Sequence, residues 1–246
     1  MKYYQILIEY EGTNFVGWQI QENGISIQEL VQKALKKIFK KKILLNGAGR
    51  TDAGVHAYKQ SASFSVENEI KNKNIFIHSI NFFLKNYPIS IVDLKNRNKN
   101  FHARFSAKKR VYKYLIINRV GKLSIDKDRG WLIKKKLNLD LMKKGAKILL
   151  GTHDFSIFRA SSCGAKSPIK TINKASIVQD EDNISIMFES KSFLQQQVRS
   201  MVGCLKYLGE NKWSLKDFKE AIASKKRSKC APPAPPHGLY LFDIKY

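Results

Sequence analysis

The chain has 246 residues, 43% of them hydrophobic and 26% charged, which is enough apolar sequence to bury a core and excludes an intrinsically disordered chain. With 45 Lys and Arg against 20 Asp and Glu, its formal net charge is +25. AT-rich codon usage would raise the lysine content, but it would not explain why acids are scarce. The charge therefore favours a polyanionic partner, with nucleic acid first and an anionic membrane second.

Targeting segments, disulfides and metal sites are not expected. No run approaches 18 consecutive apolar residues, and the N-terminus begins with a strand-like pattern instead of a secretory signal. Cys163, Cys204 and Cys230 form no Cys-x-x-Cys pair and fit a reducing compartment. The five histidines are scattered, so they indicate no metal site. We expect a cytoplasmic protein without a metal.

Periodicity predicts the order β-α-β-β-α-β in the first hundred residues. Lys2–Tyr10 alternates as a strand, and the capping box Ser26–Glu29 opens an amphipathic helix that runs to Phe39. The later elements are a strand at Lys42–Asn46, a strand at Val55–Val66, a helix at Ile70–Asn86 and a strand at Ile89–Leu94. This is the order of a ferredoxin-like half.

The second half repeats that order. Its strands are predicted at Arg110–Asn118, Ile169–Val178, Ile184–Glu189 and Leu239–Tyr246, and its helices at Leu139–Leu150, Leu194–Leu208 and Leu215–Ala223. We therefore expect an α+β fold of two ferredoxin-like halves, 1–100 and 101–246. They would form a mostly antiparallel sheet with helices on one face and an active-site cleft between the halves. The proline-rich Pro232–Pro236 is predicted to be a stiff connector before the last strand.

The most informative segment is the Gly-rich loop Gly47–Ala57, with the sequence GAGRTDAGVHA. A dinucleotide-binding loop would need a third glycine where Asp52 stands, and a Walker A loop would need a lysine at Val55. What remains is the Asp52 carboxylate two residues from the Arg50 guanidinium. On spacing alone, this pair fits either an ion pair that ties a turn together or chemistry that needs a carboxylate.

As a whole, the loop resembles the signature of the tRNA pseudouridine synthase A (TruA-type) family, and the resemblance extends over nearly the whole chain. The other segments that carry it are Tyr10–Gln19, Gln60 and Phe64, Phe101–Ala107, Arg110–Tyr114, Gly151–Phe155, Phe158–Ala160, Phe193–Leu194, Val198–Gly203 and Gly238–Leu239. The sequence departs from the family at Tyr87, Ser161–Ser162, Lys170 and Gln195–Gln197. These departures bear on contacts with tRNA and not on the chemistry.

The resemblance implies an isomerase that converts uridine to pseudouridine in the anticodon stem-loop of tRNA, at tRNA positions 38, 39 and 40. This reaction is redox-neutral, so no cofactor is expected, in keeping with the absence of nicotinamide, flavin and metal motifs. The family works as a homodimer whose two subunits share one tRNA, so we expect a homodimer here too.

The resemblance also assigns roles to three residues at the reaction centre. Asp52 would be the catalytic carboxylate, either as a nucleophile at C1′ or C6 or as a base. A partly buried carboxylate needs a nearby cation to stay ionised, and Arg199 is the family's candidate, although its helical position also fits a side chain that extends to solvent. Tyr112 would pack on the target base with its hydroxyl near the carboxylate, although its pattern also fits core packing.

Further residues would contact the tRNA. Arg50 would hold open the gap left when the target uridine leaves the base stack. Alternating aromatic and cationic side chains suit base stacking and phosphate contact, and a polar loop later in the chain is also implied. The residues concerned are Phe101, His102, Ala103, Arg104 and Phe105, then Arg159, Ala160, Ser161, Ser162 and Cys163, and finally Leu239. Cys163 is expected to pack as a small residue and not to act as a nucleophile.

Two other functions fit parts of the sequence. A non-catalytic RNA-binding protein with RRM-like halves would suit the element order and the charge, but neither half contains an RNP1-type string, and Asp52 would have no role. A basic membrane-surface protein would need a cationic amphipathic helix with Trp or Phe on its apolar face. The predicted helices have ordinary Leu, Ile and Ala stripes, so we expect no membrane partner.

Overall fold

Contacts within the chain divide the computed structural model, which describes residues 1–246, into two units. Unit 1 comprises Met1–Lys108 and Tyr240–Tyr246, and unit 2 comprises Lys109–Leu239. The predicted boundary lies after residue 100, whereas the observed one lies between Lys108 and Lys109. The prediction also placed the last strand in the second half. From Tyr240 on, that strand belongs to unit 1, where it runs parallel to one of the strands.

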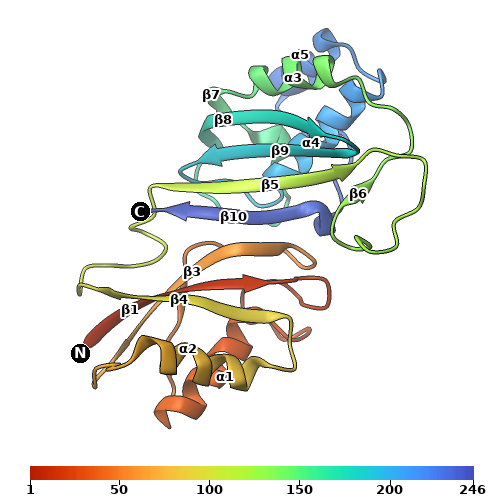
Figure 1. Ribbon diagram of the computed structural model, residues 1–246. Coiled ribbons are helices and arrows are strands. Elements are labelled where there is room, and N and C mark those ends of the chain that lie inside the picture. Colours follow the sequence, from red (N-terminus) through yellow and green to blue (C-terminus); the bar gives the residue numbers. More distant parts are fainter. The chain divides into compact units, whose positions relative to one another are not determined.

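Unit 1 contains a four-stranded ferredoxin-like sheet with an added strand (Figure 1). The central strand β1 is antiparallel to both β3 and β4, and β2 is antiparallel to β3, which gives the order β4-β1-β3-β2. The added strand β10 runs parallel to β3. The elements are β1 (Lys2–Tyr10), α1 (Ile27–Phe39), β2 (Asn46–Gly47), β3 (His56–Val66), α2 (Lys73–Leu84), β4 (Ile89–Arg97) and β10 (Leu239–Lys245).

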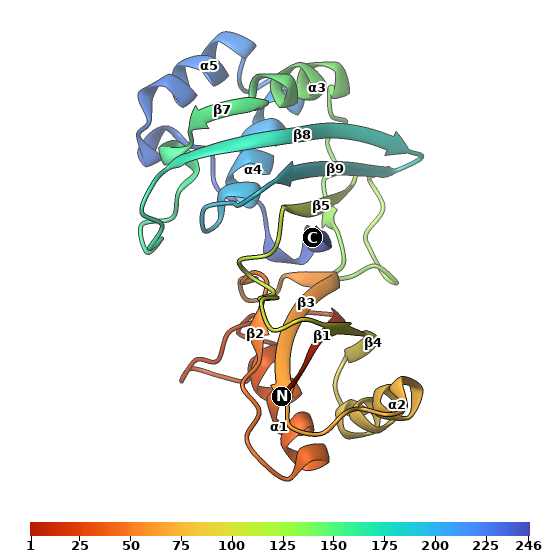
Figure 2. The same ribbon diagram turned by 90° about the vertical axis from the view of Figure 1, so that its left-hand side faces the viewer.

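Helices α1 and α2 lie together on one face of this sheet (Figure 2). Each begins at a side-chain cap: Ser26 Oγ accepts from the Glu29 amide at 3.3 Å, and Asn72 Oδ1 accepts from the Ile75 amide at 3.1 Å. The apolar stripe of α1, which includes Ile27, is buried against the sheet. The sheet and its two helices therefore form a core of their own.

Unit 2 repeats this strand pairing. Strand β5 pairs with β9, β9 pairs with β8, and β8 pairs with β7, all antiparallel, whereas the short β6 is parallel to β5. The elements are β5 (Lys109–Ile117), β6 (Trp131–Leu132), α3 (Leu139–Ile148), β7 (Gly151–Asp154), β8 (Ile169–Asp180), β9 (Asn183–Ser190), α4 (Gln197–Gly209) and α5 (Leu215–Ser224), with 3₁₀ turns η1 (Ser156–Phe158), η2 (Arg227–Lys229) and η3 (Pro236–Gly238).

The predicted α+β class is confirmed, with mostly antiparallel strands and duplicated halves. In unit 1, β1 pairs with β3 and β3 pairs with β2; correspondingly, in unit 2, β5 pairs with β9 and β9 pairs with β8. The predicted cleft between the halves stays a prediction. None of the helices is both long enough and apolar enough to cross a membrane.

Several predicted elements have different bounds, and three of these differences have a clear cause. The strand predicted at Lys42–Asn46 is reduced to Asn46–Gly47, because the carbonyls of Ile43 and Leu45 accept from glutamine side chains of α1 instead of a neighbouring strand. Helix α2 begins three residues later than predicted, after its Asn72 cap. Helix α4 also begins three residues late, because Gln196 has a left-handed conformation, with φ of 61°.

Strand β7 was not predicted at all. Its residues Gly151–Asp154 are polar and mostly exposed, so they show no alternation of buried and exposed side chains. The strand forms because it pairs with β8 at the edge of the sheet.

Candidate active site

The loop Gly47–Ala57 lies in unit 1 and is fixed to the N-terminal strand at Thr51, the residue before Asp52. Thr51 Oγ1 lies 2.8 Å from Tyr10 Oη, and the Thr51 carbonyl accepts from the Trp18 amide at 3.1 Å. The Tyr10 and Trp18 rings stack with their centroids 6.3 Å apart. Side chain and backbone at Thr51 are therefore both held before the chain reaches Asp52.

Two glycines of segment 11–19 allow close backbone contact with this loop. A Cβ on Gly17 would lie 2.4 Å from the Thr51 carbonyl oxygen, and Gly17 has φ of +108°. A Cβ on Gly12 would lie 2.0 Å from the carbonyl oxygen of Val55. Since only glycine lacks a Cβ, both positions require it. Segment 11–19 thus contacts the backbone on both sides of Asp52.

The loop is also held from β3. Its Ala48 amide donates to the Ser61 carbonyl at 2.8 Å, and the Gly49 carbonyl accepts from Gln60 Nε2 at 2.9 Å. At the end of the loop, His56 is buried, and its Nδ1 accepts from the Gly12 amide at 2.9 Å. Accepting at Nδ1 leaves Nε2 as the protonated nitrogen of the neutral ring.

The two charged residues of the loop differ in their surroundings. Asp52 is partly buried, and its carbonyl accepts from the Val55 amide at 3.2 Å in a tight turn. Arg50 is exposed and has neither a hydrogen bond nor an ion pair. The interpretation of Arg50 and Asp52 as an ion pair that ties the turn is therefore wrong.

The segment Phe101–Phe105 joins the same part of unit 1 through β3. The Ala103 amide donates to Ser63 Oγ at 3.1 Å, and the Ala103 carbonyl accepts from Tyr246 Oη at 2.9 Å. Ala103 is fully buried. It therefore anchors the segment, and it offers no side chain to an RNA.

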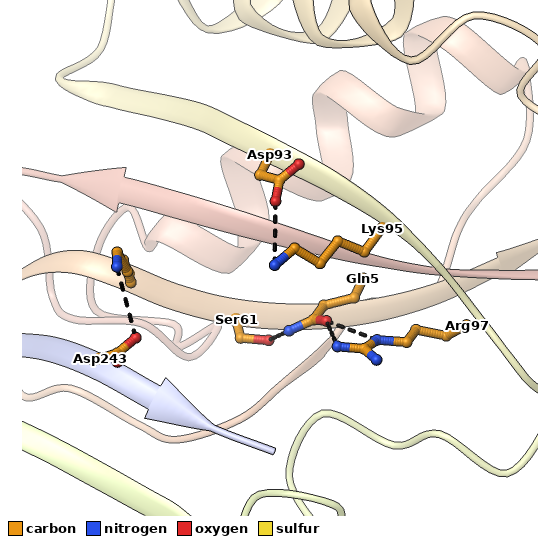
Figure 3. A network of polar contacts seen from close by, with 7 residues as sticks. Gln5, Ser61, Asp93, Lys95, Arg97 and Asp243 are labelled. Atoms are coloured by element: carbon orange, nitrogen blue, oxygen red, sulfur yellow. Dashed lines mark hydrogen bonds and ion pairs between the residues drawn. The ribbon is translucent and has the colours of Figure 1, made fainter.

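A largely buried polar network links β1, β3 and β4 (Figure 3). Gln5 donates to Ser61 Oγ at 2.8 Å, and Gln5 Oε1 accepts from both Nε and Nη2 of Arg97 at 2.8 and 2.6 Å. The Arg97 guanidinium also lies 4.5 Å from the centre of the Phe101 ring. Because Gln5 is only 2% exposed, each of its polar atoms needs such a partner. This network fixes Phe101.

By contrast, Arg104 and Phe105 are exposed. Phe105 is 75% exposed, with the His102 ring 4.5 Å away on centroids and the Arg104 guanidinium 5.5 Å away. The Arg104 amide donates to His102 Nδ1 at 3.1 Å, which orders the turn. Exposed aromatic and cationic groups side by side can stack on a base and contact a phosphate.

In unit 2, Tyr112 lies on β5 opposite Phe188 of β9, and its ring packs edge-on against Phe193 at 5.2 Å. Only 8% of Tyr112 is exposed. Its ring thus has a packing partner within unit 2, and its role at the target base stays a prediction.

Arg199 lies on α4 and is held by the connector before β10. Arg199 Nε donates to the Ala234 carbonyl at 2.7 Å, and the Ala234 amide donates to the Arg199 carbonyl at 2.9 Å. The charge of Arg199 acts on two neighbouring groups. Burial raises the pKa of Tyr114, and the Arg199 charge opposes this rise. Burial lowers the pKa of His237, and the Arg199 charge lowers it further. Arg199 is thus a partly buried, anchored cation and not a side chain extended to solvent.

The loop Arg159–Cys163 is held by its own arginine. Arg159 Nη2 donates to the carbonyls of Cys163 and Ala165, so its guanidinium stabilises the loop conformation. Burial would raise the pKa of Cys163, but hydrogen bonds from the Gln195 and Ala165 amides and the Arg159 charge hold it below its usual value.

Gln195 is one of the departures from the family, and it contacts this loop directly. The Ala160 amide donates to the Gln195 carbonyl at 3.2 Å, and Ser162 Oγ donates to Gln195 Oε1 at 3.3 Å. Ser161 is exposed beside them, whereas Leu239 is buried at the start of β10. Of these residues, Ser161, Ser162 and Gln195 are exposed and can meet a ligand, whereas Ala160 and Leu239 are buried.

Sequence reasoning missed several supporting residues: Gln5, Ser61, Ser63, Arg97 and Tyr246. Each lies in or beside a strand and has no motif of its own, so only the folded strands bring them together. No group of three or more His, Cys, Asp or Glu side chains is placed to hold a metal ion.

Comparison with known proteins decides the family. A family profile described as "tRNA pseudouridine synthase" matches residues 6–106 and 146–246. The chain belongs to the tRNA pseudouridine synthase family. It is 59% identical to tRNA pseudouridine synthase A of Pelagibacter ubique, over 99% of both chains. The enzymes of that name from Parvibaculum lavamentivorans and Rhodopseudomonas palustris strain BisB18 are 42% and 43% identical over the whole of both chains.

This membership confirms the resemblance seen in the sequence. The matched residues include segment 11–19, the Asp52 loop, the segment Phe101–Phe105 and α4 with Arg199. The roles predicted for individual residues remain predictions.

The contact between Gly17 and Thr51 gives a stability prediction. Gly17→Ala adds a Cβ at positive φ and also forces it against the Thr51 carbonyl, so we expect a loss of unfolding free energy of about 1–2 kcal/mol from φ and about 1–3 kcal/mol more from the clash. Gly151→Ala is the matched control, since Gly151 has φ of +95° but only His153 Nε2 near its added Cβ, at 3.5 Å. Urea unfolding measures both variants, and equal losses would contradict the close contact.

Proposed function

We propose that this member of the tRNA pseudouridine synthase family isomerises uridine to pseudouridine in the anticodon stem-loop of tRNA, at tRNA positions 38, 39 and 40, as a cytoplasmic homodimer with Asp52 as its catalytic carboxylate. Family membership supports uridine isomerisation in tRNA. The net charge of +25 suits a polyanionic substrate.

The observation that carries the proposal is the way the Asp52 loop is held. The reaction breaks the bond between N1 of uracil and C1′ of ribose, turns the base and joins C5 to C1′. Each route to it needs a carboxylate held in place beside the nucleotide. Thr51 is fixed through its side chain and its carbonyl, and Gly12 and Gly17 contact the backbone on either side of Asp52. Such fixed placement lowers the entropic part of a reaction barrier.

Arg50 acts in extruding the target base. It is the exposed, unpaired cation two residues from Asp52, so it is free to enter the gap that the uridine leaves. Arg104 and Phe105 contact neighbouring nucleotides, with Phe105 as a stacking surface.

Arg199 keeps Asp52 ionised, and Tyr112 packs on the target base. Support for Arg199 comes from its anchoring: two hydrogen bonds to Ala234 hold this partly buried cation in one place. A cation held in this way favours the charged form of a carboxylate near it.

Replacing the carboxylate tests the catalytic role. Asp52→Asn keeps the size of the side chain but removes its charge, so we expect no measurable pseudouridine formation, with tRNA affinity within about twofold of the unaltered protein. Asp93→Asn is the matched control, because Asp93 is a partly exposed carboxylate of unit 1 that pairs with Lys95 on the same strand, and it should retain full activity. Nucleoside analysis of treated tRNA measures the product.

Residual activity of Asp52→Asn within about tenfold of the unaltered protein corresponds to only about 1.4 kcal/mol of barrier. That result would remove Asp52 from the catalytic step.

The two arginines should affect different steps. Arg50→Ala should reduce turnover more for a uridine paired in a stem than for one in an open loop, because extrusion costs free energy only when the base is stacked. Arg199→Ala should reduce turnover for both substrates and move the acid limb of the pH–rate profile upward, because losing the cation raises the pKa of the carboxylate. Arg199→Lys should restore activity in part.

Both variants are assayed on two stem-loops that differ only in whether the target uridine is paired. Equal losses for Arg50→Ala on the two substrates would contradict its role in extrusion. An acid limb that stays in place in Arg199→Ala, under single-turnover conditions, would contradict the role of Arg199.

A further inference from the structure

Two cysteines far apart in sequence meet in unit 2. Cys204 lies on α4, and Cys230 directly follows η2; their sulfur atoms are 3.6 Å apart, and both are free thiols. Cys204 is buried at 1% exposure, whereas Cys230 is partly exposed. Their separation in sequence hid this pair, because no short cysteine motif marks it.

We propose that Cys204 and Cys230 form an oxidation site, which closes to a reversible disulfide when the protein meets hydrogen peroxide. The Cys230 thiolate attacks the peroxide, giving a sulfenic acid and hydroxide. The Cys204 thiol then displaces the sulfenic oxygen, which leaves as water. In balance, two thiols lose two hydrogen atoms, the peroxide is reduced to two waters, and one S–S bond forms.

The backbone around the pair supports closure. The segment that follows Cys230 crosses α4 closely, since a Cβ on Gly203 would lie 2.0 Å from the Pro232 carbonyl oxygen. A disulfide bond is about 2.05 Å long, so the two sulfurs must approach by about 1.5 Å from their 3.6 Å separation. Rotation of the two side chains and a small shift of one segment can supply that movement.

Local charge distinguishes the two sulfurs. The hydrogen bond from Cys204 and then the Arg227 charge lower the pKa of Cys230, against the effect of burial. The same hydrogen bond and burial raise the pKa of Cys204. Arg227 is itself fixed, because its Nη1 donates to Ser200 Oγ at 2.8 Å. The more exposed sulfur is thus also the better nucleophile, and the buried sulfur is the one that resolves the sulfenic acid.

Closure acts on the elements that hold Arg199. Cys204 follows Arg199 on α4, and Cys230 precedes Ala234, whose amide and carbonyl both hydrogen-bond to Arg199. Drawing the sulfurs together therefore pulls on both segments at this anchor. This consequence rests on the function proposed for Arg199: the disulfide form should make pseudouridine at least about fivefold more slowly, since shifts of about 1 Å in a reacting group are costly.

The experiment treats the purified full-length protein with hydrogen peroxide and measures intact mass, peptide linkage and turnover on tRNA. We expect a mass lower by two hydrogen atoms, a peptide linking Cys204 to Cys230, slower turnover, and full recovery with dithiothreitol. Under reducing conditions, Cys204→Ser should turn over tRNA at the rate of the unaltered protein. With peroxide at low concentration it should form no linked peptide, and its rate should not fall. Cys230→Ser should behave alike.

Addition of oxygen at Cys230 without loss of two hydrogen atoms would overturn the proposal. A complete disulfide with unchanged turnover would overturn its effect on Arg199. The mass measurement is independent of catalysis: a reduced protein that makes no pseudouridine would refute the proposed function and leave the oxidation site to be judged by mass alone.

Discussion

The backbone contact between Gly17 and Thr51 is the constraint on which the candidate site depends. Any side chain at Gly17 would collide with the Thr51 carbonyl, and the Trp18 amide donates to that same oxygen. One glycine therefore lets segment 11–19 lie directly against the loop that carries Asp52. The loop needs this outside support because a short Gly-rich segment has high conformational entropy, which the contacts with Thr51 offset.

Unit 2 uses a similar device in another place. A segment without regular structure crosses α4 at Gly203 and hydrogen-bonds to Arg199 through Ala234. Proline at the neighbouring positions restricts this segment before folding, so less entropy is lost when it is fixed. In both units a glycine permits a close backbone contact near a charged residue of the candidate site.

Much of the fold could be predicted, because β1, α1 and α3 show clean periodicity. One error arose where side chains replace backbone partners: Gln28 and Gln32 bind the carbonyls that would have extended β2. The Asp52 loop was found from its sequence, yet the network of Gln5, Ser61 and Arg97 was not, because its residues come together only across paired strands. The Cys204–Cys230 contact escaped prediction because α4 and the residue after η2 meet only in the folded unit, and no short cysteine motif marks the pair.

The central claim is that this chain moves the glycosidic bond of a tRNA uridine from N1 to C5. The most direct measurement is tritium release from unmodified tRNA labelled at uridine C5, since C5 gives up its hydrogen only when it joins C1′. The account predicts that catalytic amounts of the protein release tritium in proportion to the pseudouridine formed. Tight tRNA binding without any release would contradict it, and would favour a non-catalytic RNA-binding protein.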